Sequence, residues 1–107
     1  MQLKVGKTRL EVFVYTTIWK RFKGFMFQKK PIQNGICFPK CNSIHTFFMR
    51  QPIDIVMTDR DHRIIRLYSA LKPWRIIFPQ KRVYYTYELP CGTIQSLKEK
   101  QTLTLSE

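Results

Sequence analysis

Apolar and polar residues alternate in short runs along the chain, a pattern of period two that is typical of β-strands. The strongest runs cover 10–15, 53–58, 63–68 and 83–89. Weaker extended segments are predicted at 36–38, 44–49, 75–78 and 102–105. The segment Asp59 to His62 reads as a turn between two of the strong runs, so the sequence predicts a β-hairpin there.

Two segments favour short helices instead. Thr16 or Thr17 can cap a helix that ends at Gly24, and Thr93 can cap one or two helical turns before residue 100. Six or seven short strands with one or two short helices predict a mainly β fold. We expect a compact single-domain barrel or two-layer sandwich of mostly antiparallel strands.

The length and composition fit one folded domain. The chain has 107 residues, of which 44% are hydrophobic and 14% aromatic, enough to form one modest core. We therefore expect a single domain over residues 1–107.

The charge is strongly basic. Nineteen Lys and Arg against seven Asp and Glu give a formal net charge of +12, which attracts anionic partners. Non-specific binding of nucleic acid through this charge is one possibility. Tyr84, Tyr85 and Tyr87 beside Lys81 and Arg82 could form a stacking platform for single strands, although alternating tyrosines are also ordinary in strands. The sequence contains no established nucleic-acid-binding signature.

The sequence predicts a cytoplasmic protein. No apolar run is long enough to span a membrane, and the first residues lack the apolar core of a signal peptide. Three cysteines are a poor basis for a disulfide framework, which agrees with a reducing compartment.

Polar side chains gather within and near the apolar stretch 41–56. Burying an unpaired carboxylate costs several kcal/mol, so we expect Asp54 to meet a donor such as Arg50, Arg75 or His45. Glu88 poses the same problem within its predicted strand. The candidate ligand-binding residues are His45, Thr46, Arg50, Asp54, Trp74, Arg75 and Glu88.

Such a pocket would suit a small anionic or polar ligand, or a protein partner, because Arg grips carboxylates and phosphates. Trp74 would stack on a ligand if exposed, or cap the core. Two alternatives stay open: the same cluster could serve a hydrolase-like or other enzyme, or it could be an internal network that only holds strands together. The sequence lacks a Gly-rich phosphate loop, a nucleophile elbow and a zinc-protease motif, so no cofactor is predicted.

Cysteine and histidine spacing raises two weaker hypotheses. Cys37, Cys41 and His45 could ligate zinc with Cys91 as a fourth ligand, although the tight cysteine knuckles usual in zinc sites are missing. Cys41 and His45 could instead form a nucleophile and base. The alternative to both is a buried thiol beside a hydrogen-bonded histidine.

Several motifs in order resemble those of the DUF192 family, small bacterial and archaeal domains of unknown function. The stretch 41–61 is similar to the family's central His-Thr-x-x-Met-x-x-Pro-Ile-Asp motif, and Gly24 to Gln28 resembles a Gly-Leu-Met block. Lys72 to Arg75 and Tyr87 to Thr93 match two later blocks. The chain departs from the family pattern at His62, where Gly is common. The resemblance implies a compact β-rich fold and supplies no substrate.

Overall fold

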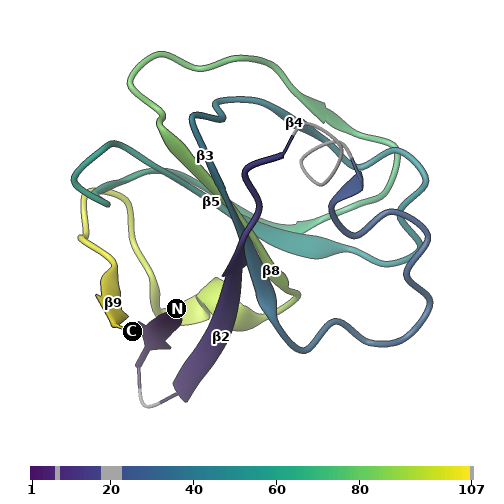
Figure 1. Cartoon of the computed structure of the whole chain (residues 1–107), viewed down its shortest axis with the longest axis horizontal. Helices are drawn as coiled ribbons and strands as arrows, with labels where there is room; N and C mark the ends of the chain where they lie inside the picture. Colours follow the sequence, from purple (N-terminus) through teal and green to yellow (C-terminus); the bar gives the residue numbers. More distant parts are fainter. Residues whose placement is uncertain (7, 18–22, 107) are drawn as a thin grey trace.

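The computed structural model describes residues 1–6, 8–17 and 23–106, and these form two β-sheets (Figure 1). The strands are β1 (Gln2–Val5), β2 (Thr8–Val14), β3 (Gly35–Pro39), β4 (Ile44–His45), β5 (Ile53–Thr58), β6 (Ile64–Leu71), β7 (Ile76–Ile77), β8 (Tyr85–Pro90) and β9 (Thr104–Ser106). One 3-10 helix, η1 (Thr93–Ser96), follows β8. The mainly β fold predicted from the sequence is confirmed.

The larger sheet has the strand order β6-β5-β8-β3-β2-β1-β9, and β4 pairs with β7 in a separate two-stranded sheet. Strands β2 and β3 are parallel, and the other pairs of the described strands are antiparallel. An antiparallel bridge between Arg63 and Thr102 brings the two edges of the large sheet together. The sheet therefore curls into a half-barrel, with both chain ends at the β1 and β9 side (Figure 1).

The two faces of this sheet bury different clusters of apolar side chains, because successive residues of a strand point to opposite faces. One cluster contains Val56, Tyr87 and Leu89, with η1 packed over it through Ile94. The other contains Ile36 and further residues from the loops before and after β4. The face on which a polar residue of β5 or β8 lies thus decides its neighbours.

Several sequence predictions need correction in detail. Strand β4 ends at His45, whereas extended chain was predicted as far as Met49, because the chain turns at Phe48 with a φ of 63°. The helix expected before Gly24 falls mainly on residues 18–22, outside the described part of the chain. The helical turns expected after Thr93 are present as η1, but the predicted cap is wrong: Gly92 is the N-cap residue, and no side chain that the structure describes caps the helix. Among the described residues, no helix is long and apolar enough to cross a bilayer.

The turn between β5 and β6 accounts for the departure of His62 from the family pattern. Its φ is 64°, the left-handed region that glycine adopts most easily. Two backbone amides, those of Asp61 and Arg63, donate to Oδ1 of Asp59 at 2.9 and 3.0 Å. The ring of His62 stacks on Tyr85 with 4.6 Å between centroids. These contacts hold a non-glycine residue in the same turn.

Candidate functional site

The buried carboxyl group of Glu88 lies in a small pocket on the β4 side of the large sheet. The cavity measures about 90 Å³. Its walls come from the segment after residue 22, from β3, and from the segment around β4: Lys23, Gly24, Phe25, Met26, Phe38, Cys41, Ser43, Ile44, His45 and Met49. A drug-sized ligand needs a pocket of roughly 300 Å³ or more, so this cavity accepts only the end group of a ligand.

Glu88 reaches this place through the register of the sheet. On β8 it pairs with Ile36 of β3 on one side and with Ile55 of β5 on the other. Both neighbours belong to the apolar cluster of that face. The side chain is 5% exposed, and within the described chain its Oε1 atom has no hydrogen-bond partner. A buried oxygen without a partner is rare in folded proteins and calls for a functional explanation.

Burial raises the pKa of Glu88 to about 8, because water stabilises a carboxylate and the apolar surroundings do not. The backbone amide of Phe25 donates to the carboxyl group and opposes this effect only in part. At neutral pH the group therefore holds its proton and can both donate and accept a hydrogen bond. Above its pKa it becomes an anion in a largely apolar pocket.

Cys41, Ser43 and His45 add polar atoms to the same pocket. The Cys41 thiol lies 3.1 Å from the carbonyl oxygen of Ser43, to which it donates. The amide of Phe47 donates to Nδ1 of His45 at 3.2 Å, which leaves the proton of a neutral imidazole on Nε2. The thiol is thus bonded to a carbonyl rather than activated by the imidazole, which disfavours the predicted nucleophile pair.

Gly24 fits closely over the Glu88 carboxyl group. Its φ is 47°, and a Cβ atom added there would lie 2.9 Å from Oε1 of Glu88. We expect Gly24→Ala to lower the free energy of unfolding by about 1–3 kcal/mol, through backbone strain and displacement of the carboxyl group. Urea denaturation measures this loss. Gly92→Ala is the control, since Gly92 also has a positive φ but an added Cβ meets nothing within 4 Å. If both variants lose the same unfolding free energy, backbone strain at the positive φ alone explains the loss, and contact with the Glu88 carboxyl group contributes nothing.

Asp54 lies on the opposite face of the sheet from Glu88. It pairs with Leu89, whereas its neighbour Ile55 pairs with Glu88, and alternation along the strand separates the two carboxyl groups. Asp54 is fully buried, but its acceptors are used by backbone amides: Ala70 donates to Oδ1 at 2.8 Å and Ile94 to Oδ2 at 3.1 Å. The prediction that Asp54 meets Arg50, Arg75 or His45 is therefore wrong.

The remaining residues of the predicted pocket do not line the cavity. They surround the turn at residues 46–49 that follows β4, which we call the β4 turn. Thr46 is buried, and its hydroxyl group donates to the carbonyl of Lys72 at 2.7 Å and accepts from the amide of Arg75 at 2.8 Å. Arg50 and Arg75 are exposed, and Trp74 is 56% exposed, so it does not cap the core. Of the predicted site residues, only His45 and Glu88 line the same cavity.

The cysteines do not form a metal site. Among the described residues, no three or more His, Cys, Asp or Glu side chains lie close enough to hold a metal ion. Cys37 is buried on the Tyr87 face, Cys41 lines the Glu88 pocket, and Cys91 is exposed. Burial raises the pKa of the Cys37 thiol to about 11, and the hydrogen bond with Tyr87 lowers this pKa only in part. Cys37 is therefore an unreactive thiol. The zinc hypothesis for Cys37, Cys41, His45 and Cys91 is wrong.

The tyrosines of the predicted stacking platform are also engaged elsewhere. Tyr87 is fully buried and Tyr85 packs against the same core cluster. Tyr84 is half-buried, and the Arg60 guanidinium lies over its ring at 4.8 Å from the centroid. These residues therefore stabilise the sheet and its turn and offer no open aromatic face.

Comparison with known proteins identifies the relatives of this chain. The family model of DUF192, described as "Uncharacterized ACR, COG1430", matches residues 1–105. The chain belongs to the DUF192 family. It is 37% identical to a UPF0127 protein of Pyrococcus horikoshii over 82% of this chain and 79% of that protein. It is 34% identical to a UPF0127 protein of Pyrococcus furiosus over 88% of this chain and 84% of that protein.

Two solved structures share the fold of this DUF192 chain. One is a protein of unknown function from Novosphingobium aromaticivorans, with a TM-score of 0.79 and 16% identity over 97% of this chain and 82% of that chain. The other, from Sinorhizobium meliloti, is titled a putative transcription regulator. It has a TM-score of 0.78 and 19% identity over 96% of this chain and 89% of that chain. At these identities the likeness shows the fold alone.

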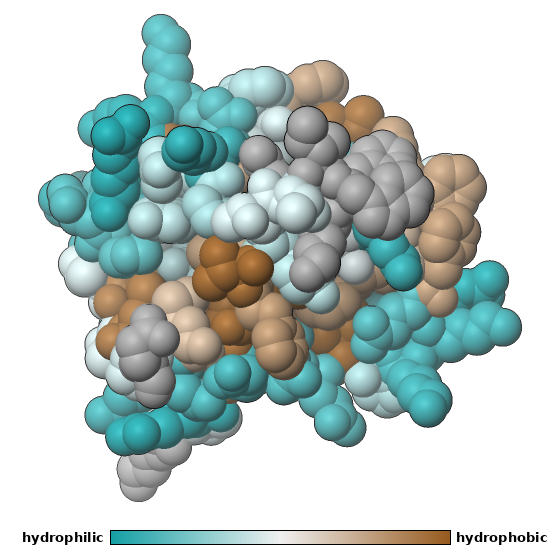
Figure 2. Space-filling model, viewed as in Figure 1, coloured by the Kyte–Doolittle hydropathy of each residue, from teal (hydrophilic) through white to brown (hydrophobic). Residues whose placement is uncertain are grey.

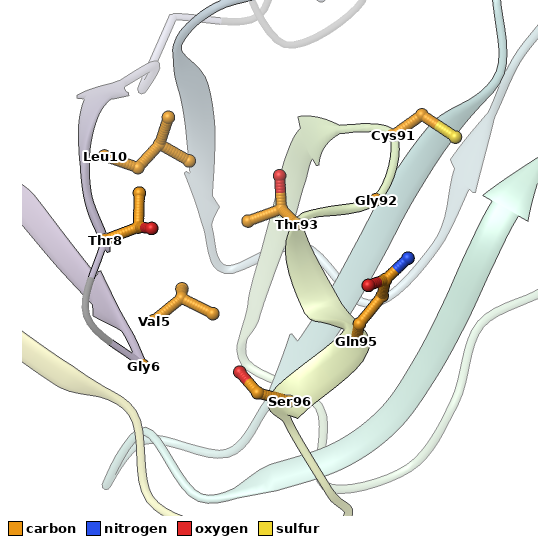
Figure 3. Close-up of a pocket in the computed structure, with 9 residues that line it drawn as sticks. All are labelled: Val5, Gly6, Thr8, Leu10, Cys91, Gly92, Thr93, Gln95 and Ser96. Atoms are coloured by element: carbon orange, nitrogen blue, oxygen red, sulfur yellow. The ribbon is translucent and has the colours of Figure 1, made fainter.

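A second, larger hollow lies at the other end of the DUF192 fold, between the β1–β2 hairpin and η1 (Figure 3). It measures about 490 Å³. Val5 and Leu10 give it an apolar wall, and the hydroxyl group of Ser96 points from η1 toward that wall (Figure 3). The hydroxyl group of Thr93 instead donates to the carbonyl of Pro90 at 2.6 Å. Cys91 directs its sulfur away from the hollow (Figure 3). No carboxylate, imidazole or cationic side chain lines this hollow among the described residues, so it offers less chemistry than the Glu88 pocket.

Sequence reasoning missed the loop residues that complete the Glu88 pocket. The sequence pattern assigns Gly24 to the end of a helix and gives Phe25 no role of its own. The resemblance of 24–28 to a family block was a signal that this segment does more than end a helix. A glycine can also mark a close approach of backbone to a side chain, and at Gly24 that side chain is Glu88.

Proposed function

We propose that this DUF192 chain is a small ligand-binding domain whose ligand places a hydroxyl or amine group against Glu88. The observation that carries the proposal is the unpartnered Oε1 atom of a buried carboxyl group in a cavity of about 90 Å³. A ligand group in this cavity would supply the missing hydrogen bond, which is worth more in an apolar pocket than in water.

The chemistry of the pocket favours a donor over an anion. Above its pKa, Glu88 repels anions. Arg50 and Arg75, which were predicted to hold an anion, do not line the cavity, and Lys23, which does, is an exposed residue. The body of the ligand has room next to the cavity. A hollow of about 640 Å³ shares Lys23, Gly24, Phe25 and Met26 with it. The ligand would therefore insert one polar end and leave the rest over this segment.

Amide chemical shifts test the proposal with three probes: glycerol, methylammonium and acetate. We expect glycerol and methylammonium to shift the amide signals of residues 23–26 and 41–45, and acetate at pH 9, where Glu88 is ionised, to leave them unchanged. Methylammonium should bind more tightly at pH 9 than at pH 6, because ionised Glu88 attracts a cation. In Glu88→Gln this pH dependence should vanish.

Glu99→Gln is the matched control, since it makes the same chemical change at an exposed position. It should leave both the shifts and the pH dependence as they are in the wild-type protein. If neither donor probe shifts these amides, or if Glu88→Gln responds to methylammonium as the wild type does, the pocket is not a binding site for such groups.

Enzyme activity at this pocket is a second candidate, favoured by one observation. A pKa of about 8 keeps Glu88 protonated near neutral pH, as a general acid requires. Binding is the stronger proposal because the Cys41 thiol is committed to the Ser43 carbonyl, so the residues provide no activated nucleophile. A rate of hydrolysis on model esters or glycosides that falls in Glu88→Gln but not in Glu99→Gln would favour the enzyme.

A further inference from the structure

Aromatic side chains gather on the surface beside the β4 turn. Phe27, Phe48 and Trp74 are 54%, 47% and 56% exposed, and they come from loops far apart in the sequence. The ring of Phe48 lies 5.4 Å from that of Phe27 and 4.8 Å from that of Trp74, measured between centroids. Phe47 extends the group, with its centroid 5.8 Å from that of Trp74. We call these four residues the aromatic surface.

The backbone presents these rings in an unusual way. Phe27, Phe48 and Trp74 have φ angles of 66°, 63° and 65°, in the left-handed region that bulky residues avoid. Each such residue costs of order 1 kcal/mol or more, and such residues concentrate at ligand-binding sites. Figure 2 shows hydrophobic (brown) residues at several places on the molecular surface, between hydrophilic (teal) ones. Among the exposed large hydrophobic residues that the structure describes, those with a positive φ are Phe27, Phe48 and Trp74, and all three belong to the aromatic surface.

Hydrogen bonds fix the three loops to one another. The amide of Phe27 donates to the carbonyl of Phe48 at 3.0 Å, and the amide of Trp74 donates to the carbonyl of Thr46 at 2.9 Å. The side-chain amide of Gln51 donates to the Lys30 carbonyl at 2.8 Å. The rings are therefore held in place before any partner arrives, which lowers the entropy cost of binding.

The charged residues of the three loops that carry the aromatic surface are all cationic. No Asp or Glu occurs from Val12 to Ile53 or from His62 to Tyr87, the two stretches that contain the three loops. Exposed cations flank the aromatic residues in each loop: Lys23, Lys29, Lys30, Arg50, Lys72 and Arg75. The nearby Glu88 is buried and holds its proton at neutral pH. The surface therefore complements a polyanion that also offers flat apolar faces.

We propose that the aromatic surface binds single-stranded nucleic acid, with bases stacked on Phe48 and Trp74 and phosphates held by the flanking cations. Single strands expose both base faces and phosphates, which matches aromatic residues among cations. Within residues 23–106, which the structure describes without a gap, these loops provide no recognition helix for a duplex groove. This proposal does not rest on the Glu88 pocket, although Lys23 lines that pocket and Phe27 lines the hollow beside it.

Fluorescence anisotropy with labelled oligo(dT) and oligo(U) of about 12 nucleotides tests the proposal. We expect Trp74→Ala and Phe48→Ala each to raise Kd by about 5- to 150-fold, the loss of one stacked base. Phe78→Ala is the matched control, because Phe78 is 74% exposed and makes no ring contact with the aromatic surface. It should leave Kd unchanged. Circular dichroism confirms that each variant is folded.

Salt dependence separates stacking from charge. The slope of log Kd against log salt concentration should fall by about 0.7 in Lys72→Ala, since one phosphate contact is lost, and should stay unchanged in Trp74→Ala. If Trp74→Ala and Phe78→Ala bind as the wild type does, charge alone drives binding and the proposal is overturned. The proposal is also overturned if the wild-type protein does not bind the oligonucleotides. If Trp74→Ala then abolishes self-association in sedimentation, or binding to phosphatidylglycerol vesicles, the aromatic surface serves a second copy of the chain or a membrane instead.

Discussion

The Glu88→Gln variant is expected to become more stable than the wild-type protein as pH rises from 5 to 9. In the unfolded chain a glutamic acid in water has its ordinary pKa of 4.5, whereas burial raises the pKa of Glu88 in the folded protein to about 8. Between these values the folded state holds a proton that the unfolded state has released. Stability then falls with rising pH, by about 1.4 kcal/mol for each pH unit, because folding must take up that proton.

The contribution of protonated Glu88 to the free energy of unfolding is thus fully present below pH 4.5 and is lost as pH rises through about 8. Over this window the loss is on the order of 5 kcal/mol, a large share of the stability of a small domain. Glutamine does not titrate, so Glu88→Gln should be no more stable than the wild type at pH 5 and more stable by several kcal/mol at pH 8–9.

Urea denaturation at pH values from 5 to 9 gives the difference in unfolding free energy between the variant and the wild type. Comparing the two proteins cancels the other titrating groups. Glu99→Gln removes the same acid from an exposed position and should give a difference that stays flat with pH. A flat difference for Glu88→Gln as well would show that the carboxyl group is solvated or paired in solution, and the pocket would lose its main feature.

The fold was largely predictable because strand formation depends on local pattern. Alternation located the segments that became β2, β3, β5, β6 and β8, and the acidic turn before β6 was found from its residue types. A barrel and a two-layer sandwich were both expected, and the sequence could not choose between them, since the choice follows from which strands pair. The bridge between Arg63 and Thr102 joins residues far apart in the chain, and no local pattern encodes it.

The candidate site was only half predictable for the same reason. Alternation places Asp54 and Glu88 within strands, but it does not say which residues lie opposite each other. The register of β5 against β8 pairs Glu88 with Ile55 and sends Asp54 to the other face. A shift by one residue would have placed both carboxyl groups together. The predicted cluster therefore failed on a feature that depends on non-local pairing.

The two buried acids, Glu88 and Asp54, differ in their hydrogen bonding. One oxygen of Glu88 lies beside a cavity and has no partner among the described residues, whereas both oxygens of Asp54 accept hydrogen bonds from backbone amides. One of those amides belongs to Ala70, whose φ is 51°, next to an irregularity in the pairing of β5 with β6. The other belongs to Ile94, in η1. Asp54 therefore joins the edge of the sheet to the 3-10 helix that covers it.

Replacing Asp54 should consequently destabilise the fold without altering the Glu88 pocket. We expect Asp54→Ala to lower the free energy of unfolding by about 2–4 kcal/mol, because the buried amide of Ile94 loses its acceptor at about 1–3 kcal/mol and the part-buried amide of Ala70 at about 1 kcal/mol. Asp54→Asn should cost about half as much, since its single side-chain oxygen still serves one amide. Urea denaturation measures both losses, and the asparagine variant keeps the comparison possible if Asp54→Ala is too unstable to purify.

Asp59→Ala is the matched control for this prediction. Oδ1 of Asp59 also accepts two backbone amides, those of Asp61 and Arg63, but in an exposed turn where water replaces the lost bonds. Its loss should be about 1 kcal/mol. In Asp54→Asn the amide signals of residues 23–26 should respond to methylammonium as they do in the wild type, because the sheet separates the two carboxyl groups. Comparable losses in Asp54→Ala and Asp59→Ala would mean that water reaches Asp54, and the acid would then be no link between the sheet and η1.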